Sequence, residues 1–174
     1  YTKEHVKRKR GSKGSSRKNY LARLVTEFQS SETASDFKLQ VLANLANFSY
    51  DPMNYGFLLD LNVHLLFLDA LEEEDGKFVE FGTAGLSNII LDPRVNKQIC
   101  DEEGSIDLII QGLSSTNIEV VLNTMTVLYY MVNADNQQAI LTEELIDAMR
   151  RYARAKNTRL RNIASIFLQD NVQH

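Results

Sequence analysis

Apolar residues recur along the chain at the spacing of amphipathic helices from Lys18 onward. The segment 20–28 places its apolar side chains on one helical face. A second helix is predicted over 37–48, with Asp36 as its N-cap. The apolar positions of these segments are Tyr20, Leu21, Leu24, Val25 and Phe28, then Phe37, Val41, Leu42, Leu45 and Phe48. The folded part of the chain is therefore expected to begin with two helices.

Breaks in this pattern mark the helices that follow. Asp51 before Pro52 predicts a helix start, because proline at the first helical position leaves no intrahelical hydrogen bond unmade. The strongly apolar segment 58–71 predicts a helix pair interrupted near 60–62, and the acidic segment Glu72–Gly76 predicts a loop. A long helix is predicted over 78–90, and another over 160–168.

An internal repeat decides the fold class. The run LANF at 45–48 precedes Asp51-Pro52, and the run LSNI at 86–89 precedes Asp92-Pro93 at a spacing of 41. A weaker third copy follows, since 136–140 is similar to 96–100 at a spacing of 40. A period of about 40 residues is typical of armadillo and HEAT repeats, whose units bury their apolar faces only by stacking on neighbours. The period therefore predicts an all-α solenoid of about four repeats, of the armadillo or HEAT class.

Composition narrows the possible functions. The 174 residues include one cysteine, Cys100, and three separated histidines, His5, His64 and His174, so neither a disulfide framework nor a metal centre is expected. No apolar run is long enough to span a bilayer, and no secretory signal is recognisable, which favours the cytosol or nucleus. The usual motifs for nucleophilic catalysis and for phosphate-binding loops are missing. We therefore expect a protein that is not an enzyme and needs no cofactor.

Charge is unevenly distributed along the chain. Residues 1–20 carry eight basic residues and one acid, residues 21–147 carry five basic residues and 21 acids, and residues 148–174 carry six basic residues and one acid. Because residues 1–17 also lack apolar periodicity, the sequence predicts a basic, mobile arm there and a repeat domain over 18–174. Such an arm is compatible with a nuclear-import signal, with a nucleic-acid contact and with a solubilising tail.

Two segments carry a resemblance to armadillo repeats in particular. The run NKQICDEEGSIDLII at 96–110 resembles the armadillo stretch NKQAIVEAGAIPALV, and GLSNI at 85–89 resembles the third-helix segment ALSNLA. Gly104 in the first run fits the sharp turn between the first and second helices. The resemblance extends over about 18–171 and favours armadillo over HEAT repeats. It implies an all-α armadillo-repeat right-handed superhelical solenoid of about four repeats.

A narrower resemblance points to one group within that family. The segments 24–29, 40–48, 50–55 and 159–168 look like those of a small protein with little more than these repeats. This resemblance implies a nuclear component of the minor spliceosome that is bound to RNA-binding motif protein 48. It also implies an association with the capped end of the U6-type small nuclear RNA. The alternative is a general armadillo adaptor that binds a peptide or helix of a cytosolic signalling partner.

Third-helix side chains of an armadillo array line its concave groove, and they provide the first candidate site. Asn47 and Asn88 occupy equivalent positions, Asn44 lies one turn before Asn47, and Tyr129 follows Asn88 at the same spacing of 41. An asparagine amide donates and accepts at once, so it suits a bound peptide backbone. The alternatives are exposed polar positions and bonds to a neighbouring repeat. One turn earlier stand Ala43, Ala84 and Met125, not tryptophan, which argues against the binding of nuclear-import signals.

A second candidate site is the arginine cluster near the C-terminus. It comprises Arg150, Arg151, Arg154, Arg159 and Arg161, with Lys156 among them. Arg150 and Arg154 are expected on one helix face, and Arg159 and Arg161 are expected to open the last helix. One positive patch would suit RNA phosphate or an acidic protein surface, whereas pairing with Glu143, Glu144 and Asp147 would consume the charge. Because Tyr152 is the only aromatic residue among them, base-specific reading is not expected.

Overall fold

The computed structural model describes residues 17–172. The predicted basic arm therefore lies outside the described residues, except for Arg17, which is the first residue of α2, the first helix that the structure describes. The α-helices are α2 (Arg17–Gln29), α3 (Ser35–Ser49), α4 (Tyr55–Asp60), α5 (Val63–Asp69), α6 (Gly76–Ile89), α7 (Pro93–Asp101), α8 (Ser105–Gln111), α9 (Ile118–Met131), α10 (Gln137–Ile140), α11 (Glu143–Tyr152) and α12 (Thr158–Asn171). Two 3-10 turns, Pro52–Asn54 and Gly112–Ser114, complete the described helical structure.

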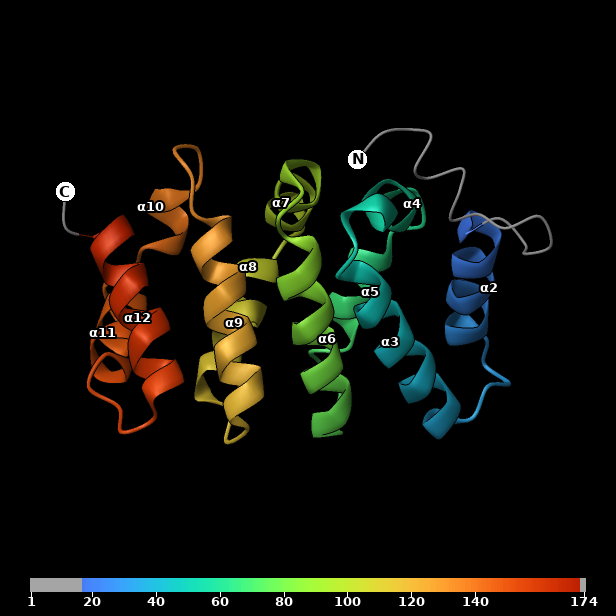
Figure 1. Ribbon diagram of the computed structural model, residues 1–174, viewed down its shortest axis with the longest axis horizontal. Helices are drawn as coiled ribbons and strands as arrows, with labels where there is room; N and C mark the ends of the chain where they lie inside the picture. The colour runs from blue at the N-terminus through green and yellow to red at the C-terminus, as the bar shows by residue number, and fades with distance from the viewer. Residues whose placement is uncertain (1–16, 173–174) are drawn as a thin grey trace.

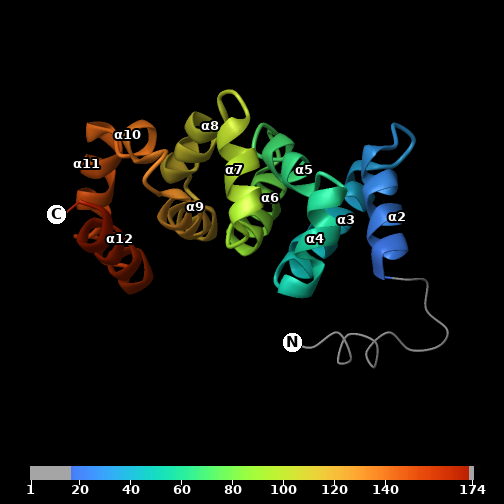
Figure 2. The ribbon, with the colours of Figure 1, turned by 90° about the horizontal axis from the view of Figure 1, so that it is seen from above.

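The helices form a single curved row of repeats. The long helices α3, α6, α9 and α12 stand side by side, and the shorter helices pack behind and above them (Figure 1). Seen from above, the row bends, so that the long helices line its inner side (Figure 2). Within the described residues this gives three units of three helices, α4–α6, α7–α9 and α10–α12, preceded by the pair α2 and α3.

Local sequence explains where most of these helices begin and end. The Asp51 carboxylate accepts a hydrogen bond from the Met53 amide at 3.1 Å, which confirms the predicted helix start at Pro52. Asn62 adopts a left-handed conformation with φ of 53°, and this separates α4 from α5 at the predicted break. Gly104 has φ of 78°, as the predicted sharp turn between α7 and α8 requires.

One predicted cap is wrong. Helix α3 begins at Ser35 after Ala34, so Asp36 lies inside the first turn and makes no capping bond. Its negative charge still lies near the helix N-terminus, where the exposed amides favour an anion. No side chain caps the start of α3, so the sequence of the segment 30–36 does not specify the first helical residue strongly.

The core runs continuously through the repeats and fixes their register. Leu45, Leu86 and Leu128 are completely buried at equivalent places in α3, α6 and α9. The first two lie at a spacing of 41, but Leu86 and Leu128 lie at a spacing of 42, so one extra residue separates α6 from α9. The predicted period of 41 is therefore right for the first step and one residue short for the second.

Hydrogen bonds between helices, both within a unit and between neighbouring units, supplement this apolar stacking. The Tyr55 hydroxyl donates to the Asn88 carbonyl at 2.7 Å, and the Asn96 amide donates to the Tyr130 carbonyl at 3.0 Å. The Tyr152 hydroxyl similarly donates to the Leu113 carbonyl. Because these bonds join different helices that are distant in sequence, they stabilise the stack rather than individual helices. None of the described helices combines the length and apolar character that crossing a bilayer requires.

Candidate functional site

A shallow groove crosses the concave face between α3, α6 and α9. It encloses about 250 Å³. Small side chains from α3 and α6 leave room there, and longer polar side chains border it. The lining residues are Ala43, Ala46, Asn47, Glu80, Phe81, Ala84, Asn88, Glu119 and Asn123. Two of the four predicted groove residues, Asn47 and Asn88, are thus brought together.

Asn47 and Asn88 differ in what their amides do. Asn47 is exposed, and its side chain makes no hydrogen bond to any of residues 17–172. The Asn88 side chain instead donates to the Ala46 carbonyl at 3.0 Å. The sequence left open whether these asparagines contact a partner or a neighbouring repeat. For Asn88 the bond to a neighbouring repeat is present, whereas Asn47 presents a free amide to the groove.

Asn44, one turn before Asn47 on α3, does not line the groove. It is half-buried and accepts a hydrogen bond from the Gln40 amide at 3.3 Å. Its equivalent in α6 at the 41-residue spacing is the buried Gly85, which packs on α5.

The extra residue between α6 and α9 changes the third ladder position. By the buried pattern, Asn88 corresponds to Tyr130, which is 47% exposed, and not to Tyr129. Tyr129 instead bridges α9 and α12, where its hydroxyl donates to the Asp170 carboxylate at 2.8 Å, and this bond raises the pKa of Tyr129. In the same way Thr126, not the fully buried Met125, corresponds to Ala84. The placement of Tyr129 and Met125 in the groove from the 41-residue spacing was therefore wrong.

Asn123 and Glu119 line the groove but were not among the predicted site residues. A local signal for them exists, because Glu119, Asn123 and Thr126 fall at helical spacing within the otherwise apolar segment 118–131. Such a polar stripe on an apolar helix marks its solvent face. A fixed spacing of 41 residues from Asn47 and Asn88 leads to Tyr129, and it therefore does not point to this stripe.

The two carboxylates that border the groove are already paired. Glu80 accepts hydrogen bonds from Lys77 and Asn117, each at 2.9 Å, and chiefly the Lys77 bond lowers the pKa of Glu80. The Arg159 guanidinium donates two hydrogen bonds to the Glu119 carboxylate, one of them at 3.0 Å, and these bonds lower the pKa of Glu119. The groove is therefore bordered by ion pairs and is not a concentrated negative site.

For the arginine cluster the sequence left open a single positive patch or pairing within the chain, and three of its five arginines make contacts within the chain. Arg150 pairs with Asp147 at 2.8 Å, and Arg159 reaches across to Glu119 on α9. The Arg161 guanidinium donates to the Ala155 carbonyl at 2.9 Å. Because α11 ends at Tyr152, Arg154 lies beyond the helix and does not share a helical face with Arg150, so that expectation was wrong. Arg151 and Arg154 remain exposed.

A larger hollow of about 960 Å³ lies outside the groove, between α7 and α10. Leu91 and Tyr130 at its border are 50% and 47% exposed. Cys100 lines this hollow and is half-buried rather than fully buried, and burial raises the pKa of its thiol. Among residues 17–172, no three His, Cys, Asp or Glu side chains gather as a cation site. The hollow is therefore a second candidate contact surface of apolar character.

His64 gives rise to a prediction about pH. It is only 2% exposed, its Nδ1 has no partner in the described part of the chain, and burial lowers its pKa although Glu102 opposes this. The unfolded chain therefore binds this proton more readily than the folded chain, and stability is lost as pH falls below about 6.5. We expect the stability of a His64→Leu variant to change less than that of the wild type between pH 7 and pH 5. Urea denaturation at each pH measures the difference, and parallel curves would contradict the prediction.

Comparisons with known proteins identify the family. No family model matches the chain. The chain is 44% identical over 156 residues to armadillo repeat-containing protein 7 from Mus musculus, a match that covers 88% of the chain and 78% of that protein. The chain belongs to the armadillo repeat-containing protein 7 family. The predicted family resemblance is thereby confirmed at the level of sequence.

Solved structures confirm the armadillo fold of this family member. A computationally designed armadillo repeat protein for modular peptide recognition superimposes with a TM-score of 0.76 at 12% identity, over 86% of this chain and 63% of that protein. A designed armadillo repeat protein in complex with the peptide (KR)4 gives a TM-score of 0.69 at 17% identity, over 87% of this chain and 64% of that protein. The chain thus spans a little under two thirds of these designed proteins. The predicted solenoid of armadillo repeats is confirmed, and it is a protein-binding scaffold fold.

Proposed function

We propose that this chain is a non-catalytic adaptor that holds a segment of a protein partner in its concave groove. We further propose that the partner is RNA-binding motif protein 48, and that the pair acts in the nucleus as part of the minor spliceosome, in the splicing of minor-class introns. The observation that carries the binding proposal is the free Asn47 amide, which lies in a groove with Asn123 and the small residues Ala43 and Ala84. The membership in the armadillo repeat-containing protein 7 family supports the choice of partner.

The groove chemistry favours a partner segment with little charge. Both of its carboxylates are paired within the chain, with Lys77 and Arg159, so a basic peptide would have to displace existing ion pairs. The Asn47 amide suits both backbone carbonyl and N–H groups, which every extended segment offers. The Asn123 oxygen accepts from the Ser87 hydroxyl at 3.5 Å, and its NH2 group remains to donate to a backbone carbonyl. Phe81 adds an apolar surface beside them. We therefore expect an extended, mostly neutral segment rather than a basic signal.

The groove proposal is tested by an Asn47→Ala/Asn123→Ala double variant. Each substitution removes an amide that would bond to the partner backbone, and each such bond contributes about 1 kcal/mol to binding. The dissociation constant is therefore expected to rise by about tenfold to thirtyfold. Asn88 is left in place because its bond to Ala46 also stabilises the stack. Calorimetry with the purified partner measures affinity, and a pull-down from nuclear extract measures recovery of the partner together with minor-spliceosome RNA.

Two further variants make this experiment decisive. Asn162→Ala removes an exposed asparagine of α12 outside the groove lining and is expected to bind like the wild type. Leu91→Arg places a charge at the hollow between α7 and α10. If Leu91→Arg loses the partner while the Asn47→Ala/Asn123→Ala variant retains it, the binding site lies at that hollow and the groove proposal is refuted. If the wild type recovers neither the partner nor the RNA, the proposed spliceosomal role is refuted, and the assignment of the fold is not affected.

A further inference from the structure

The end of α11 and the connection that follows it, residues 151–156, form a C-terminal turn that carries three exposed cations without an ion pair. Arg151, Arg154 and Lys156 are all exposed, and no carboxylate pairs with any of them within residues 17–172. The sequence contains no acid between Asp147 and Asp170. Both of these acids are already engaged, Asp147 with Arg150 at 2.8 Å and Asp170 with Tyr129 at 2.8 Å. The positive charge of this turn is therefore uncompensated, in contrast to the paired ions that border the groove.

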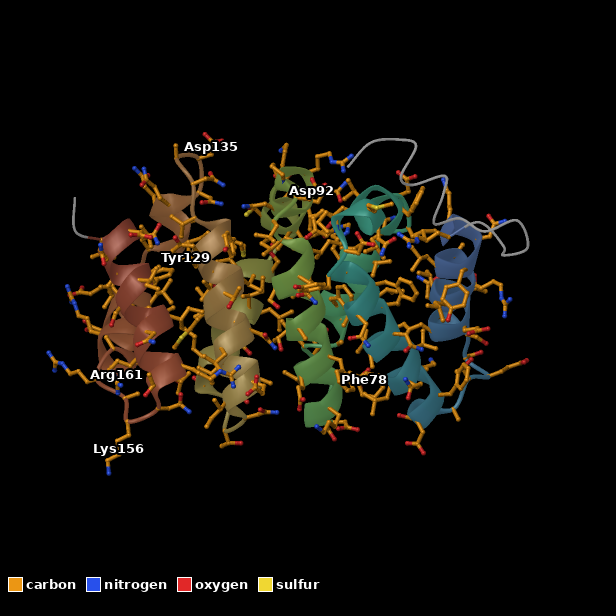
Figure 3. All side chains as sticks on the ribbon, in the orientation of Figure 1. Phe78, Asp92, Tyr129, Asp135, Lys156 and Arg161 are labelled. Carbon is orange, nitrogen blue, oxygen red and sulfur yellow. The ribbon has the colours of Figure 1, made fainter. Side chains whose placement is uncertain are left out.

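Hydrogen bonds hold this turn in a defined shape. The Arg161 guanidinium donates to the Ala155 carbonyl at 2.9 Å and to the Thr158 hydroxyl at 3.1 Å. The Asn157 side chain caps α12 by accepting from the Arg159 amide at 2.9 Å. Lys156 projects away from the fold at the lower end of the last unit, and Arg161 lies above it in this view (Figure 3). The three free cations are thus presented on a turn that does not need them for its own stability.

The surroundings of the turn favour phosphate over a protein surface. Between Leu141 and Asn162 no large apolar side chain is exposed, whereas a protein interface normally has an apolar core. Contacts to a nucleic-acid backbone need only cations placed near phosphates, and arginine forks suit phosphate oxygens. Tyr152 is half-buried and its hydroxyl bonds to the Leu113 carbonyl, so it provides no stacking platform for bases.

We infer that this turn, through Arg151, Arg154 and Lys156, binds the phosphate backbone of a nucleic acid without reading its bases. The inference goes beyond the proposed adaptor function, because it uses the opposite end of the array from Asn47 and does not depend on which protein fills the groove. Of the five arginines in the predicted cluster, it keeps Arg151 and Arg154. Arg150, Arg159 and Arg161 are engaged in contacts within the chain.

The test compares two variants of the full chain with equal charge change. The site variant is Arg151→Gln/Arg154→Gln/Lys156→Gln, and the control is Arg23→Gln/Lys38→Gln/Lys97→Gln, which removes three cations away from both the turn and the groove. Fluorescence anisotropy with a single-stranded oligouridylate, repeated over a range of salt concentrations, measures binding. The site variant is expected to bind about tenfold more weakly at low salt, and its plot of log affinity against log salt is expected to be shallower by about 2, since each phosphate contact contributes about 0.7. The control is expected to stay within about threefold of the wild type, because the cations that it loses lie away from the turn.

Specific outcomes would overturn the inference. Equal weakening by both triple variants would show that overall charge alone governs binding, and an unchanged site variant would exclude the turn. A polyglutamate of matched charge that bound as tightly, and depended on the same three residues, would identify an acidic protein segment as the partner instead. The Asn47→Ala/Asn123→Ala variant is expected to bind RNA like the wild type. The RNA-binding test therefore remains valid even if the groove proposal fails.

Discussion

Replacing Gly85 with alanine is expected to destabilise the protein by about 3 kcal/mol, although alanine favours helices more than glycine does. A Cβ atom at this position of α6 would lie 2.6 Å from the Cδ1 atom of Phe67 and closer still to two other carbons of that ring. Phe67 is completely buried in α5, so its ring has no free space into which to move. The close contact of α6 and α5 therefore depends on a residue without a side chain. Urea denaturation of the two proteins measures the loss.

A matched glycine in another helix provides the control. A Cβ at Gly56 in α4 would meet no atom within 4 Å, so Gly56→Ala is expected to raise stability by up to about 1 kcal/mol. Adding Phe67→Leu to Gly85→Ala makes room for the new methyl group. The double variant is therefore expected to be less unstable than the sum of the two single effects. Effects of the same sign at Gly56 and Gly85 would disprove the steric explanation.

The sequence predicted the helices well because strong local signals mark their ends. Asp51 before Pro52, the left-handed Asn62 and Gly104 act over short stretches of chain, and each appears where the pattern indicates. Asp36 is the exception, because Ala34 and Ser35 offer a start that no strong cap specifies. The ends of the predicted helices thus lie within about three residues of the observed ends, close to the usual precision of such boundaries.

The candidate site was predicted less completely because it depends on register and on distant pairs. One extra residue before α9 makes Tyr130, and not Tyr129, the equivalent of Asn88, and a fixed repeat period cannot detect this shift. The bonds from Arg159 to Glu119 and from Tyr129 to Asp170 join residues 40 and 41 apart. Local periodicity carries no information on such contacts. Which groups are left without a partner, such as the Asn47 amide and the cations of the C-terminal turn, therefore follows from the three-dimensional structure and not from the sequence pattern.

The second large effect is expected from Phe167→Ala, which should cost about 3–5 kcal/mol in the C-terminal unit. Phe167 is completely buried in α12, and no following unit covers α12 within the described residues. Because each unit of a solenoid is stabilised only by its neighbours, the loss is expected to stay local. Hydrogen exchange should accelerate in α11 and α12 while α3 and α6 keep their protection.

Ile166→Ala is the control for this prediction, because the neighbouring side chain is 48% exposed and contributes little burial. Opening of α12 by Phe167→Ala would also separate Arg159 from Glu119, and the Glu119 carboxylate would then face the groove without its partner. We therefore expect this variant to weaken binding of a neutral partner segment more than Ile166→Ala does. Faster exchange throughout the chain would instead mean that the array unfolds as one cooperative unit. In that case the effect on the groove would follow from global unfolding and not from the lost ion pair.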